Sequence, residues 1–388
     1  MDARWLAGSR DPVLKRSTER ILTTHVGSLP VPEGLTEVGL ASAVTDVVKK
    51  QAKIGVDVVN DGELSKGNWL AYAAARLAGF EARRVATGES VIARGKDRER
   101  FAEFYEEATR SNTLFHSSWT SVNVSNWSTH WVATEPIRYV GQPQVQRDVD
   151  NLSSALRDVS VVEAFLPVTA PASLEPYRSN EFYASESAFL YALADAMKEE
   201  YEIIARAGLL VQIDDAWTVA LWDRVGPTIG LEAFLRRCHQ RAELLNHALS
   251  GIPEERIRYH ICWGSWHGPH LYDLPLADFM PVLLSVHAGA YLVEAANVRH
   301  EHEYHLWERV RLPTGKVLIP GVVSHSTNLI EHPELVAERI GRYVRLLGRE
   351  NVIAGTDCGM GGRIHPQLAW AKLEALVEGA RLASKALA

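Results

Sequence analysis

Short apolar runs typical of β-strands alternate with helical stretches along most of the chain, and this alternation limits the folds available to it. The first run covers residues 21–28, and a helical stretch at 41–54 separates it from the second run at 56–60. Parallel neighbours in a sheet need a crossover connection, usually a helix, so this order predicts a parallel α/β fold. Six further strands are predicted at residues 161–169, 209–213, 256–261, 291–295, 316–323 and 351–354.

Helices are predicted after most of these strands, at residues 186–207, 231–249, 275–288, 302–309, 333–347 and 367–387. Eight strand–helix units favour a (β/α)8 barrel, the TIM barrel, which needs about 250 residues. The surplus forms an insertion after the second strand, at about 64–149, with a charged helical piece at 96–109 and a β-prone piece at 120–140. We expect residues 1–20 to be an N-terminal extension and 21–388 to form one domain.

The composition excludes several classes of protein. A net charge of −7 without a long Lys/Arg run gives no support for binding nucleic acid. Residues 1–20 have mixed charge and no apolar core, and no run approaches the roughly 18 apolar residues that cross a bilayer, so no membrane partner is expected. Three scattered cysteines argue against a disulfide framework and predict a reducing, cytoplasmic location.

Polar and metal-binding residue types gather at the carboxyl ends of the predicted strands. They are Ser28, Glu63, Asp214, Asp215, His260, Cys262, Glu294, His325 and Cys358. The active sites of (β/α)8 enzymes lie at this end of the barrel. The shared location predicts an enzyme better than any one residue does.

A metal site is predicted around His260 and Cys262, which stand two residues apart and so leave their strand on the same face. Cys358 lies at another strand end in the glycine-rich stretch DCGMGG, whereas Cys238 lies in a helix. Glu294 is flanked by apolar residues, where a carboxylate is costly unless it is paired. The alternative is structural: a core histidine beside small buried thiols, and a salt bridge from Glu294 to Arg299.

The charge of this ligand set indicates the chemistry. Two thiolates and a carboxylate make zinc a weaker Lewis acid than the three-histidine sites that acidify water. Such a site favours a bound substrate thiol that stays nucleophilic as its thiolate. We therefore expect alkyl transfer to sulfur rather than hydrolysis.

These ligands, together with TTHVGSLP (23–30) and VDVVNDGE (56–63), resemble the catalytic barrel of cobalamin-independent methionine synthase over residues 20–385. The stretches HICWGSWHGPH, PGVVSHS and GTDCGMGGR resemble most the methionine-synthase-II-like branch that includes epoxyalkane:coenzyme M transferase. The resemblance implies a single zinc-binding catalytic barrel domain. It implies that Zn²⁺ is held by His260, Cys262, Glu294 and Cys358.

The resemblance also implies substrate residues. Ser28, Glu63 and Asp214 match positions that hold the amino and carboxylate groups of homocysteine, and His325 matches a histidine that handles the proton of the leaving group, with Asp214 as a nearby acid. A sulfonate would need a cation, for which Arg299 and Arg363 are candidates. Trp266, with His267 and His270, either shapes the pocket or packs the loop. Each strand-end residue also has a plain alternative as a turn, helix cap or surface residue.

Two features depart from the methionine synthases and count against a folate donor. The chain has no Arg-Cys-x-Lys-Pro-Pro stretch, and it has no N-terminal half-barrel. The hypothesis is a zinc-dependent S-alkyltransferase whose partners are a small thiol, similar to homocysteine or coenzyme M, and a methyl donor or epoxide.

The alternatives are epoxyalkane:coenzyme M transferase proper, a zinc-free barrel of the uroporphyrinogen decarboxylase type, and a non-catalytic zinc- or thiol-binding protein. The sequence leaves the oligomeric state open, with the insertion as a candidate interface between identical chains.

Overall fold

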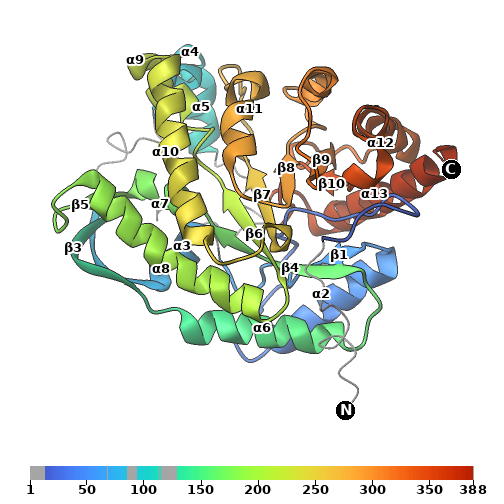
Figure 1. The fold of residues 1–388 in the computed structure, drawn as a ribbon, viewed down its shortest axis with the longest axis horizontal. Coiled ribbons are helices and arrows are strands. Elements are labelled where there is room, and N and C mark those ends of the chain that lie inside the picture. Colours follow the sequence, from blue (N-terminus) through green and yellow to red (C-terminus); the bar gives the residue numbers. More distant parts are fainter. Residues whose placement is uncertain (1–13, 68, 85–93, 112, 115–128, 388) are drawn as a thin grey trace.

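A parallel sheet forms the centre of the computed structural model, which describes residues 14–67, 69–84, 94–111, 113–114 and 129–387 (Figure 1). The sheet has seven strands in the order β1-β4-β6-β7-β8-β9-β10. Their bounds are Val58–Val59, Glu163–Thr169, Leu210–Asp215, Ile257–Ile261, Ala290–Val293, Val317–Val323 and Gly355–Thr356. All six pairings are parallel, so the carboxyl ends of the strands lie together on one side.

Two isolated bridges close this sheet into a barrel. Thr23 pairs in parallel with Ala354, next to β10, and Thr24 pairs in parallel with Val58 of β1. The predicted first strand at 21–28 is thus reduced to two paired residues, and it joins the two edges of the sheet. The (β/α)8 barrel prediction is confirmed.

Helices cover the outside of the barrel (Figure 1). Their bounds are α2 Leu40–Ile54, α6 Gln142–Leu156, α8 Glu186–Arg206, α10 Leu231–Leu249, α11 Leu276–Ser285, α12 Pro333–Leu347 and α13 Pro366–Ala386. Each turns an apolar face inward, as Val44, Val47 and Val48 do in α2. Helix α6 was not predicted, nor were the short helices α7 Pro171–Leu174 and α9 Trp222–Ile229. The helix predicted at 302–309 is the 3₁₀ helix η7, Glu301–Glu308.

The inserted segment between β1 and α6 forms most of a second, smaller sheet. Strand β2, Leu77–Arg84, pairs antiparallel with β3, Thr129–Tyr139, and β3 pairs in parallel with β5, Arg178–Asn180. Helices α3 Trp69–Ala75, α4 Lys96–Arg100 and α5 Ala102–Arg110 belong to the same segment. The charged piece at 96–109 is therefore helical, and the β-prone piece at 120–140 contains β3, while 120–128 lie outside the described residues.

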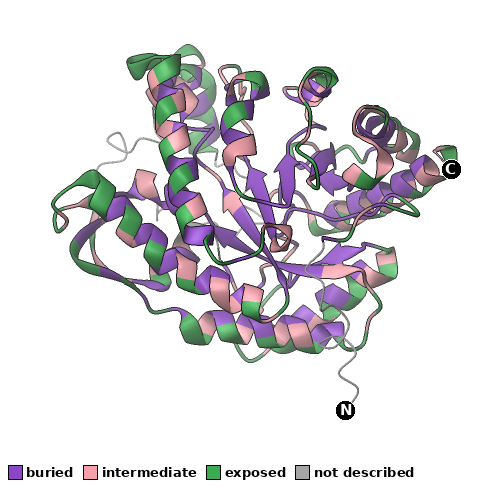
Figure 2. Cartoon of the chain, viewed as in Figure 1, coloured by how far each residue is buried: buried purple, intermediate pink, exposed green. Residues whose placement is uncertain are grey.

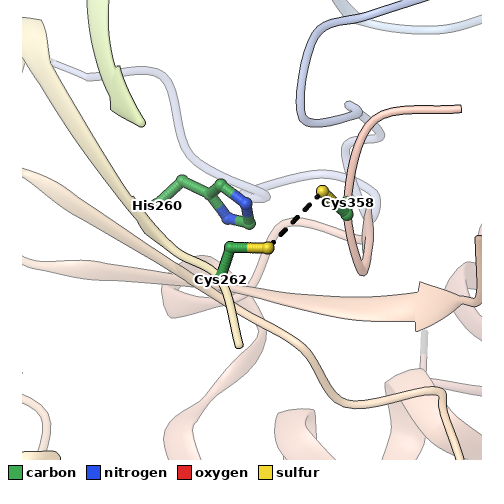
Figure 3. Close-up of side chains that lie close together, drawn as sticks. All are labelled: His260, Cys262 and Cys358. Atoms are coloured by element: carbon green, nitrogen blue, oxygen red, sulfur yellow. Dashed lines mark hydrogen bonds between the residues drawn. The ribbon is translucent and has the colours of Figure 1, made fainter. Parts of the chain in front are cut away.

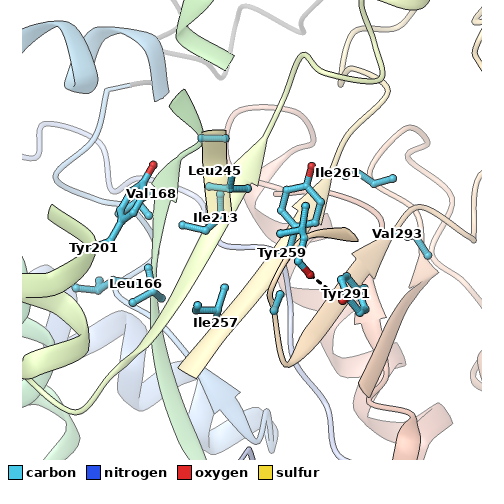
Figure 4. Packing of buried hydrophobic residues seen from close by; sticks show 14 of the residues in the cluster. Leu166, Val168, Tyr201, Ile213, Leu245, Ile257, Tyr259, Ile261, Tyr291 and Val293 are labelled. Atoms are coloured by element: carbon cyan, nitrogen blue, oxygen red, sulfur yellow. Dashed lines mark hydrogen bonds between the residues drawn. The ribbon is translucent and has the colours of Figure 1, made fainter. Parts of the chain in front are cut away.

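Buried side chains fill two regions, inside the barrel and between the barrel and its helices (Figure 2). Phe165, Leu210 and Leu292 belong to the smaller, inner cluster. Leu166, Ile213 and Tyr259 belong to the larger cluster, where they meet helix residues such as Leu245 (Figure 4). Among the described residues, no helix is both long enough and apolar enough to cross a membrane. The packed frame holds the strand ends in place, and the candidate site lies there.

Candidate metal centre

Three of the four predicted metal ligands lie together at the carboxyl end of the barrel (Figure 3). His260 is the second-to-last residue of β7, Cys262 directly follows that strand, and Cys358 follows β10. Their ligand atoms all lie within 4.8 Å of one another, and the three side chains are buried. Alternation along β7 puts His260 and Cys262 on one face, while closure of the barrel brings Cys358 to them from 96 residues away.

The geometry of this group suits a tetrahedral metal ion. The two sulfur atoms are 3.8 Å apart, and two thiolates bound to zinc at about 2.3 Å with a tetrahedral angle would be separated by about 3.8 Å. Neither ring nitrogen of His260 has a hydrogen-bond partner among the described residues, although the ring is buried. A buried imidazole without a partner is costly, and coordination to a metal ion would remove that cost.

The hydrogen bond between the two thiols shifts their pKa values in opposite directions. The hydrogen bond from Cys262 holds the pKa of the Cys358 thiol well below its ordinary value, against the effect of burial, and Arg363 acts in the same direction. The same hydrogen bond, together with burial, raises the pKa of Cys262. Without a metal ion, the pair therefore favours one thiolate, on Cys358.

Glu294, the fourth predicted ligand, lies beside the group without joining it. One carboxylate oxygen accepts a hydrogen bond from the backbone N–H of Trp263 (3.0 Å), and the other accepts one from the side-chain amide of Asn297 (2.8 Å). Burial raises the pKa of Glu294 to about 8. The alternative partner, Arg299, donates to the carbonyl of Leu271 instead. A ligand role for Glu294 stays a prediction.

Ser28 and Glu63 line the side of the site formed by the first two strand ends. The backbone carbonyl of Ser28 accepts hydrogen bonds from the N–H groups of Met360 (2.9 Å) and Gly361 (3.0 Å), which ties its loop to that of Cys358. A Cβ atom at Gly359 would lie 2.1 Å from Ser28 Oγ, so only glycine allows this close approach. Arg363 donates to Ser28 Oγ at 3.4 Å.

Glu63 and Asp214 form an acidic part of the site. Burial raises the pKa of Glu63 to about 8, and the pKa of Asp214 to about 6. The ammonium group of Lys66 opposes both shifts, and Lys66 is itself buried, with its Nζ donating to the carbonyl of Pro167. Sequence reasoning missed Lys66 and the buried Asp61, although both stand in the polar run NDGELSK at the second strand end.

His325 is buried, and its Nδ1 has no hydrogen-bond partner in the described part of the chain. Burial lowers its pKa to about 3, so the imidazole is uncharged at neutral pH. It follows the carboxyl end of β9, so it lies on the same side of the barrel as the thiol pair.

The remaining candidates have structural contacts. Asp215 accepts hydrogen bonds from Ser173 Oγ and the Tyr259 hydroxyl, both at 2.9 Å, and so braces the barrel. The ring of Trp266 stacks on His270 at 4.4 Å between centroids, which packs the loop after β7. Cys238 lies in α10 with its Sγ 3.8 Å from the carbonyl of Thr218, and burial raises its pKa to about 12.

Comparisons with known proteins agree with this fold. No protein-family model matches the chain. It is 22% identical over 383 residues to a methionine synthase of Thermococcus kodakarensis, covering 94% of each chain. It is 21% identical over 395 residues to the 2-hydroxypropyl-CoM lyase of Xanthobacter autotrophicus, covering 94% of this chain and 90% of that one.

A solved structure shows the same fold. The B12-independent methionine synthase of Shewanella sp. W3-18-1, in complex with selenomethionine, superposes with a TM-score of 0.70 at 19% identity, over 95% of this chain and 99% of that one. Similarity along nearly the whole chain, together with the buried His260, Cys262 and Cys358 group, relates the protein distantly to the cobalamin-independent methionine synthase-like family.

Proposed function

We propose that the protein is a zinc-dependent S-alkyltransferase, which joins a small thiol to a carbon taken from a methyl donor or an epoxide. The observation that carries the proposal is the pair of buried sulfurs 3.8 Å apart beside an imidazole without a hydrogen-bond partner among the described residues. Two relatives are named for thioethers, methionine and 2-hydroxypropyl-CoM, and this agrees with chemistry at a carbon–sulfur bond.

His260, Cys262 and Cys358 would hold the zinc ion, with Glu294 as the fourth ligand. Zinc in this anionic set would lower the pKa of a substrate thiol and keep the thiolate nucleophilic at neutral pH. The carboxylate of Glu294 already accepts hydrogen bonds from Trp263 and Asn297.

Ser28, Glu63 and Asp214 would bind the polar end of the thiol, and Arg363 beside Ser28 would pair with an acidic group on it. A substrate ammonium would drive proton loss from Glu63, whose pKa of about 8 leaves it mostly neutral at pH 7 in the free protein. When no substrate is bound, the nearby ammonium group of Lys66 favours the ionised form of the same carboxyl group. These groups would suit an acidic thiol with or without an amino group.

With a thiol that lacks an amino group, Asp214 would be free to serve instead as the proton donor for the leaving atom. Its pKa of about 6 is near the operating pH, whereas the uncharged His325 can hold a hydrogen bond but carries no extra proton. In the proposed step the thiolate sulfur forms a bond to carbon, the carbon–nitrogen or carbon–oxygen bond breaks, and the leaving atom takes the proton. Alignment of the two reactants on the strand ends would contribute much of the rate.

A second candidate, epoxyalkane:coenzyme M transferase proper, is favoured by the position of Arg363, because the substrate of that reaction carries a sulfonate. A zinc-free decarboxylase of the uroporphyrinogen type would need several arginines in its pocket. A storage protein would not need Ser28, Glu63 and Asp214 near the metal group.

Metal analysis of matched cysteine variants tests the proposal. Cys262→Ser and Cys358→Ser should each lose most of the bound zinc. Cys238→Ser should keep it, because Cys238 of α10 is packed in the hydrophobic core and is not one of the three clustered ligands. The proposal fails if both ligand variants retain stoichiometric zinc and full activity. Thiol loss with a panel of thiols against methyltetrahydrofolate, S-methylmethionine and small epoxides then identifies the substrates.

A further inference from the structure

Ser265 has a contact with the metal group that the proposed reaction does not yet use. It lies in the loop after β7, three residues beyond Cys262. Its hydroxyl oxygen is 3.0 Å from the sulfur of Cys358 and 3.6 Å from that of Cys262. A hydroxyl has one proton, and the shorter distance indicates Cys358 as its main acceptor.

Gly264 sets the position of this hydroxyl. Its φ of +109° is a backbone conformation that other residues rarely adopt, and a Cβ atom there would lie 1.6 Å from the ring of Trp266. The turn directs the Gly264 N–H toward the sulfur of Cys262 (3.2 Å). It also brings the hydroxyl of Ser265 next to the sulfur of Cys358. One short loop thus gives a hydrogen-bond donor to each sulfur.

A hydrogen bond to a thiolate is charge-assisted and withdraws electron density from the sulfur. In a ligand set with two thiolates and a carboxylate, this withdrawal leaves zinc more able to activate a third, incoming sulfur. It also fixes the direction in which the Cys358 sulfur points. Groups that orient the ligands of a metal ion typically change its affinity or activity by about 10- to 100-fold.

We infer that Ser265 is a positioning residue. Its hydroxyl donates a hydrogen bond to the Cys358 sulfur, and this bond influences how tightly the metal ion is bound and how much electron density the sulfur gives to it. The inference rests on the proposed zinc site. A purely structural serine would affect the loop but not the spectrum of a bound metal ion.

The test compares Ser265→Ala with Ser265→Thr, which keeps the hydroxyl, and with Ser285→Ala, which loses a hydroxyl bonded only to the Val282 carbonyl in α11. Zinc affinity is measured by competition with a chromophoric chelator. The protein loaded with Co²⁺ instead of zinc reports the thiolate-to-cobalt charge-transfer band.

Ser265→Ala should bind zinc about 10- to 100-fold more weakly. Its cobalt band should shift to longer wavelength, because a thiolate without the hydrogen bond gives up an electron more easily. Ser265→Thr should restore both values, and Ser285→Ala should match the wild type. If wild-type protein binds metal and Ser265→Ala has unchanged affinity and an unchanged band, this inference is wrong while the proposed function stands. If the wild type binds neither ion, both are wrong.

Discussion

Arg76 joins the inserted segment to the barrel through a buried ion network. It follows helix α3, and its guanidinium contacts Glu200 of α8 and Asp148 of α6, each at 2.5 Å. The three side chains are between 1% and 4% exposed, so the charges have almost no contact with water. The guanidinium also lies over the ring of Tyr72 at 4.8 Å. Arg76 thus fixes the start of the inserted segment against α6 and α8.

Arg76→Met would leave the buried Glu200 carboxylate without its ion-pair partner, and Asp148 with the partly exposed Arg147 at 3.2 Å. Removing one partner of a buried ion pair costs about 3–5 kcal/mol, because the remaining charge stays desolvated. Unfolding of 388 residues at about 2.1 cal/mol/K per residue gives an entropy of about 0.8 kcal/mol/K, so about 4 kcal/mol lowers the Tm by about 5 °C. Circular dichroism during a thermal scan measures the shift.

Two variants separate this effect from general damage. Arg83→Met removes an arginine of the neighbouring strand β2 whose ion pair with Glu181 is exposed, and it should barely change the Tm. Asp148→Asn and Glu200→Gln, added to Arg76→Met, should recover most of the loss because no unpaired charge remains. A Tm for Arg76→Met equal to that of Arg83→Met would refute the reasoning.

Two further predictions concern pH and the substrate. Burial lowers the pKa of His25 to about 4 from 6.5, so below pH 6.5 only the unfolded chain gains the proton and stability is lost as the pH falls toward 4. Urea unfolding measures the free energy of unfolding at pH 7 and at pH 4. Between these pH values the wild type should lose about 3 kcal/mol more than His25→Gln loses. Equal losses in the two proteins would contradict this. Arg363→Met should raise the KM for 2-sulfanylethanesulfonate by about 10- to 100-fold but not that for neutral 2-sulfanylethanol. Arg363→Met should raise this KM more than Arg299→Met does, because Arg363 contacts Ser28 whereas Arg299 donates a hydrogen bond to the carbonyl of Leu271.

Much of the barrel could be predicted because its strands are buried and its helices are amphipathic, so both leave periodic signals. The run at 21–28 looked like a full strand, yet only Thr23 and Thr24 pair, because an apolar segment can be buried without a continuous ladder. Strand β5 has three residues and pairs with β3, 39 or more residues earlier in the chain. No local pattern reports such a pairing.

The site was predictable where residue type and strand end coincide, as at His260, Cys262 and Cys358. The sequence did not reveal that Glu294 is already bonded to Trp263 and Asn297, because these contacts depend on how one loop folds back on another. Lys66 and Ser265 have common residue types in loop stretches. Only the closed barrel shows that their polar atoms reach the site.

The central claim is that zinc held by these residues makes a thiol reactive toward carbon, and the rate of thiol loss tests it most directly. The zinc-free protein, the same protein reloaded with zinc, and Cys358→Ser are each given the thiol and donor found active in the panel. The account predicts thiol loss with thioether formation only in the reloaded wild type. Equal rates in the zinc-free protein or in Cys358→Ser would contradict it.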